Sequence, residues 1–109
     1  MSEFDVFLAD CPARTTLALV GDTWSVVVIM ALGERPRRYG ELLDRIGGIS
    51  KKMLTQTLHK LVRNGLVERD ERLYLLTGLG VSLLGVVRTL AGWAEEHTDA
   101  LLEARPSVA

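Results

Sequence analysis

The chain has 109 residues, 48% of them hydrophobic and 25% charged, with a formal net charge of −1, and this predicts one small domain, residues 1-109, with its own core. Its longest apolar stretch, Val26 to Leu32, is too short to cross a membrane, and a single cysteine, Cys11, excludes an internal disulfide framework. The acidic amino terminus is unlike a secretory signal, so we expect a cytoplasmic protein with no membrane partner.

The first third of the chain predicts two helices. A short helix is expected from Pro12, a favourable first helical residue, to a stop at Gly21. Asp22 or Thr23 can cap the next helix, which is apolar nearly all round and is therefore expected at the centre of the core. Gly33 and Pro36 are expected to end it.

Two further helices follow, separated by a glycine turn. The segment RRYGELLDRIGG predicts a short helix, ended by the pair Gly47 and Gly48, with three side chains inward: Leu42, Leu43 and Ile46. Ser50 can cap the next helix, Ser50–Asn64, and Gly65 can end it. One apolar stripe on that helix is formed by Leu54, Leu58, Leu61 and Val62. The opposite, polar face is formed by Lys51, Lys52, Thr55, Gln56, His59 and Arg63.

The last third predicts a hairpin and a long helix. Two β-prone runs, 66–70 and 72–77, flank a tight polar turn near Asp70 and Glu71. Thr77 can cap a final helix from about Gly78 to Glu103, whose apolar residues recur at helical spacing. This order of elements is typical of a winged helix-turn-helix, a mainly α fold with a small β-hairpin.

Charge is distributed unevenly along this order. The segment from Glu34 to Arg63 has a net charge of +5, whereas the rest of the chain has −6. A basic segment in an acidic chain can attract a polyanion to one face. The same bases can also be only the solvated face of amphipathic helices, so charge alone leaves nucleic-acid binding undecided.

Several motifs together resemble the HxlR family of bacterial winged helix-turn-helix regulators, which are relatives of MarR-type repressors. They are Cys11-Pro12, Gly21 followed by Trp24, RRYGELLDRIGGISKKMLTQTLHKLVRNGLVER, YLLTGLG and WAEEH. The resemblance implies a homodimer that binds palindromic operator DNA with the helix Ser50–Asn64 in the major groove. One departure is the hairpin, because family members usually have a longer, proline-containing wing where this chain has only Asp70 and Glu71 between Arg69 and Arg72.

The polar face of the helix Ser50–Asn64 has the side chains that read base edges. Lys52 can pair with guanine and Gln56 with adenine, while Thr55 can meet a thymine methyl group or a phosphate. We expect these three to read bases. The expected phosphate contacts are Arg37, Arg38, Tyr39, Ser50, Lys51, His59, Arg63, Arg69 and Arg72.

We also expect a homodimer built from two helical elements, residues 1-21 and 78-104. The long carboxy-terminal helix has more apolar surface than so small a domain can cover internally. The expected interface residues are Val86, Val87, Leu90, Trp93 and Leu101.

An effector is a further expectation. Some relatives in the HxlR family sense oxidants through a cysteine near the amino terminus, and Cys11 lies at the start of a predicted helix, where a thiolate is favoured. A buried structural cysteine is the competing interpretation. If Cys11 is structural, a small molecule in the cleft between the DNA-binding unit and the dimer helices is the other route.

Other chemistries have little support in the sequence. Cys11, His59 and His97 are too few and too scattered for a zinc site, and we expect no metal and no cofactor. No group of acid, base and nucleophile candidates converges, so we do not expect an enzyme. A winged-helix module that binds protein instead of DNA remains an alternative, because fold does not fix function.

Overall fold

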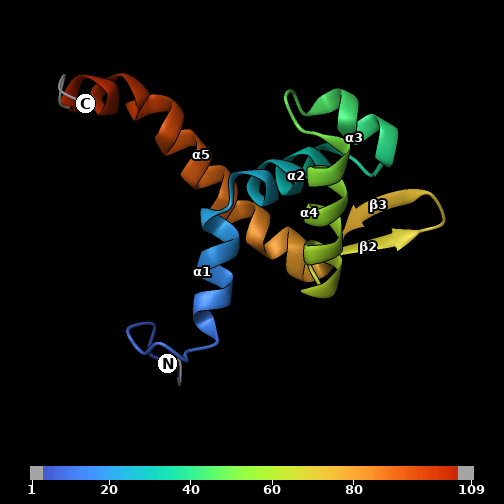
Figure 1. The fold of residues 1–109 in the computed structure, drawn as a ribbon, viewed down its shortest axis with the longest axis horizontal. Helices are drawn as coiled ribbons and strands as arrows, with labels where there is room; N and C mark the ends of the chain where they lie inside the picture. Colours follow the sequence, from blue (N-terminus) through green and yellow to red (C-terminus); the bar gives the residue numbers. More distant parts are fainter. Residues whose placement is uncertain (1–3, 106–109) are drawn as a thin grey trace.

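The computed structural model describes residues 4–105, which form five helices and a three-stranded sheet (Figure 1). In chain order the elements are α1 (Ala13–Gly21), α2 (Thr23–Glu34), β1 (Arg37–Arg38), α3 (Tyr39–Arg45), α4 (Lys51–Arg63), β2 (Val67–Asp70), β3 (Leu73–Leu76) and α5 (Gly78–Ala104). This arrangement confirms the predicted winged helix-turn-helix. Residues 1–3 and 106–109, which belong to the predicted domain, lie outside the described residues.

Three of the predicted helix caps are confirmed. The side chain of Asp22 accepts a hydrogen bond from the amide of Trp24 at the start of α2. Ser50 accepts from an amide in the first turn of α4, and Thr77 does the same for α5. These side chains satisfy amides that have no partner within their own helix, which fixes where each helix begins.

Helix α2 ends at Glu34, between Gly33 and Pro36, the two residues expected to end it. A Cβ atom built on Gly33 would lie 2.6 Å from a side-chain carbon of Leu84 on α5. Gly33 therefore lets α5 cross α2 at close range and does not break the helix.

The core lies between α2, α4 and α5. Val28 and Ile29 of α2 are buried. Leu54, Leu58 and Leu61 of α4 are also buried, as predicted for the apolar stripe. Val62, the fourth member of that stripe, is 42% exposed, so its predicted inward position is wrong. Thr57 is buried instead, because the buried face of α4 is turned towards Thr57 and away from Val62.

The sheet has the order β1-β3-β2, with both pairs antiparallel. Asp70 pairs with Leu73, so the turn between β2 and β3 consists of Glu71 and Arg72, one residue later than predicted. Strand β1 was not predicted, since two residues are too few to show an alternating pattern. It pairs with β3 and so joins the segment before α3 to the hairpin.

The carboxy-terminal half of α5 projects away from the other described elements (Figure 1). Among residues 4–105, no single helix has both the length and the apolar composition to cross a membrane. Helices α1 and α2 meet these conditions only as a pair bent by 82°.

Candidate nucleic-acid interface

Helix α4 exposes the whole polar face that the sequence predicts. Figure 1 shows α4 between the core helix α2 and the β2–β3 hairpin, with α3 above its first turn. The exposed side chains on α4 include all six polar residues singled out above: Lys51, Lys52, Thr55, Gln56, His59 and Arg63. The structure brings these side chains together on one surface, while the leucines on the opposite face fix α4 to the core.

Tyr39 joins the two helices of the helix-turn-helix. Its hydroxyl donates to the carbonyl oxygen of Lys51 at 2.8 Å and lies 3.0 Å from the hydroxyl of Thr55. Tyr39 and Thr55, one expected at a phosphate and the other at a base, therefore also hold the start of α3 against the start of α4. Sequence reasoning missed this positioning role, which depends on contacts between two helices.

Arg38 precedes α3 and its side chain is exposed. Its amide donates to a carboxylate oxygen of Glu41 at 2.8 Å, and Arg35 forms an ion pair with the other oxygen at 3.3 Å. The hydrogen bond from the Arg38 amide, followed by that from Arg35, lowers the pKa of Glu41. These bonds use only the amide of Arg38. Its guanidinium therefore stays at the surface, where a phosphate can reach it.

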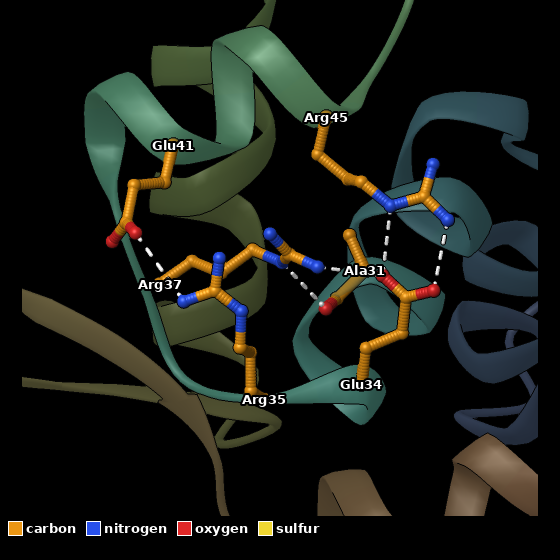
Figure 2. A network of polar contacts seen from close by, with 6 residues as sticks. All are labelled: Ala31, Glu34, Arg35, Arg37, Glu41 and Arg45. Carbon is orange, nitrogen blue, oxygen red and sulfur yellow. Dashed lines mark hydrogen bonds and ion pairs between the residues drawn. The ribbon is translucent and has the colours of Figure 1, made fainter.

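The prediction that Arg37 contacts phosphate is wrong. Arg37 is only 7% exposed, and its guanidinium donates to the carbonyl oxygen of Ala31 at 3.0 Å and to Glu34 at 2.6 Å (Figure 2). On strand β1 its side chain turns inward, where it binds the free carbonyl end of α2. The positive charge of Arg37 is therefore paired with Glu34 inside the protein and is not presented to DNA.

Glu34 is a positioning residue that the sequence analysis did not identify. Arg45 binds both of its carboxylate oxygens, each at 2.8 Å, and Arg37 binds one of the same two (Figure 2). These bonds, Arg45 first, lower the pKa of Glu34 to about 2. Glu34 thus joins the end of α2 to β1 and to the last turn of α3. The available signal was an acidic residue directly before a cluster of arginines, Arg35, Arg37 and Arg38.

A second ion pair holds α4 to the start of α2. Lys60 donates to Asp22 at 2.6 Å, and Asp22 also accepts from Ser25 and Trp24. Partial burial raises the pKa of Asp22, but these bonds outweigh it and the pKa is lowered. Lys60 is therefore a positioning residue for α4, whereas the other cations of the helix face solvent.

The hairpin presents a mixed set of charges. Arg69 donates to the carbonyl oxygen of Glu71 at 2.9 Å, and its guanidinium lies 5.5 Å from the centre of the Tyr74 ring. Arg72 is exposed at the turn. Because Glu68, Asp70 and Glu71 are also exposed, the hairpin offers phosphate little net positive charge.

Four of the five predicted interface residues lie on the surface of α5: Val86, Leu90, Trp93 and Leu101. The fifth, Val87, is a correction, because it is completely buried within the chain. Helices α2 and α5 pack together, and Val87 lies on an inward-facing side of α5. Cys11 is 8% exposed and lies two residues before α1.

The family sequence model described as HxlR-like helix-turn-helix matches residues 19–101. The chain belongs to this family. It is similar to the uncharacterized HTH-type transcriptional regulator YtfH of Escherichia coli (strain K12), with 34% identity over 96% of this chain and 89% of the relative. The family and this relative are transcriptional regulators and not enzymes.

Solved structures agree with this assignment. A protein described as transcriptional regulator ytfH from Salmonella typhimurium superposes with a TM-score of 0.83 and 32% identity, covering 93% of this chain and 96% of that one. Quinone-bound YodB from B. subtilis gives a TM-score of 0.70 and 33% identity, covering 77% and 96%. The chain is therefore a winged helix-turn-helix transcriptional regulator of the HxlR family.

Proposed function

We propose that this HxlR-family regulator is a homodimer that recognises a palindromic operator, in the cytoplasm, by placing α4 in the major groove of DNA. The observation that carries the proposal is the continuous polar face of α4, seated on a core by buried leucines on its opposite side. A major groove admits one helix of this kind, and its floor carries the donors and acceptors that distinguish base pairs.

Within this docking, Lys52, Thr55 and Gln56 read bases. All three side chains are exposed in the amino-terminal half of α4, the part of a recognition helix that contacts base edges. Lys52 donates to guanine, and Gln56 pairs with adenine through its amide. Tyr39 holds the Thr55 hydroxyl, which leaves the Thr55 methyl group as its contact with thymine.

Phosphate contacts surround these three residues. The exposed cations Lys51 and Arg63 on α4 and Arg38 just before α3, with His59, border the base-reading side chains of α4. Ser50 adds a neutral donor at the start of α4, whereas Tyr39, whose hydroxyl donates to Lys51, positions the start of α3 against α4. Such contacts fix the position of the helix on the duplex without selecting a sequence.

The dimer is formed by α5 and the amino-terminal region, residues 78-104 and 1-21. Val86, Leu90, Trp93 and Leu101 fall on one side of α5, and Trp93 is 51% exposed. Leu17 of α1 is also exposed. An apolar stripe of this kind needs a partner, and a twofold axis would place two α4 helices about 34 Å apart, one turn of DNA.

An oxidant or electrophile is one candidate effector. YodB, a relative of this chain, has been solved with a quinone bound, and quinones are electrophiles that react with thiolates. Cys11 is the only thiol of this chain, and its low exposure means that reaction requires the segment before α1 to open. This role stays a prediction, and the Cys11 variant described in the Discussion tests it.

The test of DNA reading begins by selecting the operator from random duplexes with the purified protein. The affinity for the selected operator and for random DNA is then measured by fluorescence anisotropy at several salt concentrations. Gln56→Ala should cost about 1–3 kcal/mol on the selected operator and relax one base pair of each half-site. Arg38→Ala should weaken all sequences alike and lower the salt slope by about one. Arg105→Ala, at the far end of α5, is the matched control.

Two results would refute the proposal. One is unchanged affinity of both variants for operator and random DNA. The other is binding that does not respond to salt, since neutralised phosphates release counterions and make DNA affinity fall as salt rises. The second result would favour a protein partner for the same surface.

A further inference from the structure

A pocket of about 270 Å³ lies between α2, α3 and α5, away from the exposed face of α4. Its apolar lining includes Val27 and Met30 of α2 and Ile46, which follows α3. A cavity of about 150 Å³ accommodates benzene, so this pocket has room for one ring and a short polar side chain. It is a small-molecule pocket and not a groove for a helix or a peptide.

Two arginines give the pocket an excess of positive charge. Arg88 of α5 lines it, and its guanidinium has no hydrogen bond or ion pair with any residue in the described range 4–105. Arg45 lines it from α3 and uses two of its N–H groups on Glu34. A guanidinium has five N–H donors, so three on Arg45 remain.

The carboxylate of Glu34, which also lines the pocket, does not cancel this excess. Arg37 and Arg45 both bind it, and Arg88 adds a further positive charge. The four side chains together have a net charge of +2. An anion entering from solvent therefore meets a positive field and unused donors.

We propose that this pocket binds a small organic monocarboxylate with an apolar body of about one ring. The carboxylate pairs with Arg88 and with the free N–H groups of Arg45, and the apolar body lies against Val27, Met30 and Ile46. Concave sites that combine an apolar lining with a few convergent polar groups are typical of ligand pockets. A purely inorganic anion would leave the apolar lining uncovered.

This site joins α5 to the end of α3, the helix that precedes α4. A carboxylate held by Arg88 and Arg45 shares Arg45 with Glu34 and so changes how the end of α3 is held against α2. A ligand alters operator affinity to the extent that its own affinity differs between two arrangements of the protein that bind the operator differently. This regulatory step rests on the proposed DNA binding, whereas binding of the carboxylate does not.

Calorimetry on the full chain without DNA tests the site. The probes are 3-phenylpropionate, its neutral amide 3-phenylpropanamide, and acetate. We expect 3-phenylpropionate to bind at least about tenfold more tightly than the amide, which lacks the charge, and than acetate, which lacks the ring. Arg88→Gln should weaken its binding about tenfold, Arg88→Lys should weaken it less, and Arg105→Gln, a control on the same helix, should not change it.

Three results would each overturn the site. They are equal affinity for 3-phenylpropionate and 3-phenylpropanamide, an unchanged affinity of the Arg88→Gln variant for 3-phenylpropionate, and no binding of 3-phenylpropionate at millimolar concentration. A parallel titration of operator with and without 3-phenylpropionate tests the regulatory step. That step requires 3-phenylpropionate to change the operator affinity of the wild type, and Arg88→Gln to abolish this change. An unchanged operator affinity in the presence of a bound ligand would overturn that step alone. Failure of the wild type to bind any DNA would instead refute the proposed function.

Discussion

Gly80→Ala should strongly destabilise the protein, because Gly80 lies where the end of α4, the hairpin and α5 meet. A Cβ atom at Gly80 would lie 2.1 Å from the carbonyl oxygen of Leu66 and 3.1 Å from its carbonyl carbon. Both are backbone atoms, so a rotamer change cannot relieve the contact. The same carbonyl oxygen accepts a hydrogen bond from the amide of Thr77, the cap of α5.

The magnitude follows from these contacts. Forcing an extra carbon into a packed site costs about 1–3 kcal/mol, and disturbing the hydrogen bond from Thr77 costs about 0.5–1.5 kcal/mol more. Alanine regains about 0.5–1 kcal/mol over glycine within a helix. These ranges combine to a net loss of about 0.5–4 kcal/mol, centred near about 2 kcal/mol, and the central value lowers the melting temperature of a domain of this size by about 8–16 °C.

Thermal unfolding followed by far-ultraviolet circular dichroism measures this change. Gly85→Ala is the matched control, because Gly85 lies in the same helix and a Cβ atom there would meet nothing within 4 Å. It should raise the melting temperature by a few degrees. All samples need the same protein concentration, since a dimer unfolds at a temperature that depends on concentration. A Gly80→Ala protein that melts with the wild type would refute the reasoning.

Three further variants test separate features. The pKa of Glu34 is lowered from its ordinary value of 4.5 to about 2, so its ion pairs stabilise the fold above pH 4.5 and are lost as the pH falls towards 2. Glu34→Gln should therefore flatten the loss of stability over that range in urea titrations, and an unchanged pH profile would contradict this. Trp93→Asp should shift the dimer towards monomer in sedimentation experiments, since it places a charge in the proposed apolar interface. Cys11→Ser should abolish any effect of mild oxidant on operator binding, while a wild type indifferent to oxidant would make Cys11 structural.

Features governed by neighbouring residues could be predicted from the sequence. Asp22, Ser50 and Thr77 cap their helices as expected, because a cap needs only a side chain and an amide two or three residues later. Gly65 has a φ of 74°, which suits its predicted place after α4. The polar face of α4 was also predictable, since helical periodicity alone determines which side chains share a face.

Features set by contacts between distant segments could not be predicted. Arg37 and Arg38 are adjacent in sequence, yet one is buried in the network with Glu34 and the other is exposed, because β1 alternates its sides. Val86 and Val87 divide in the same way, since one is 58% exposed and the other is completely buried. Whether each of these residues is buried depends on which helix or strand packs over it. The hydrophobic pattern of the sequence does not contain that information.

The distribution of charge between α4 and the hairpin leads to a last prediction. Arg69 is engaged with Glu71 and Tyr74, and three exposed acids accompany the two arginines of the hairpin. Helix α4 has no acidic residue beside its cations.

Operator affinity should therefore respond far more to α4 than to the hairpin. Lys51→Gln should weaken binding at moderate salt by about tenfold, because it removes one phosphate contact, whereas Arg72→Gln should change it by less than about twofold. Comparable losses in the two variants would mean that the short wing contacts the phosphate backbone after all. In that case the hairpin would have to move towards DNA on binding, since its acids would otherwise repel the phosphates that Arg72 approaches.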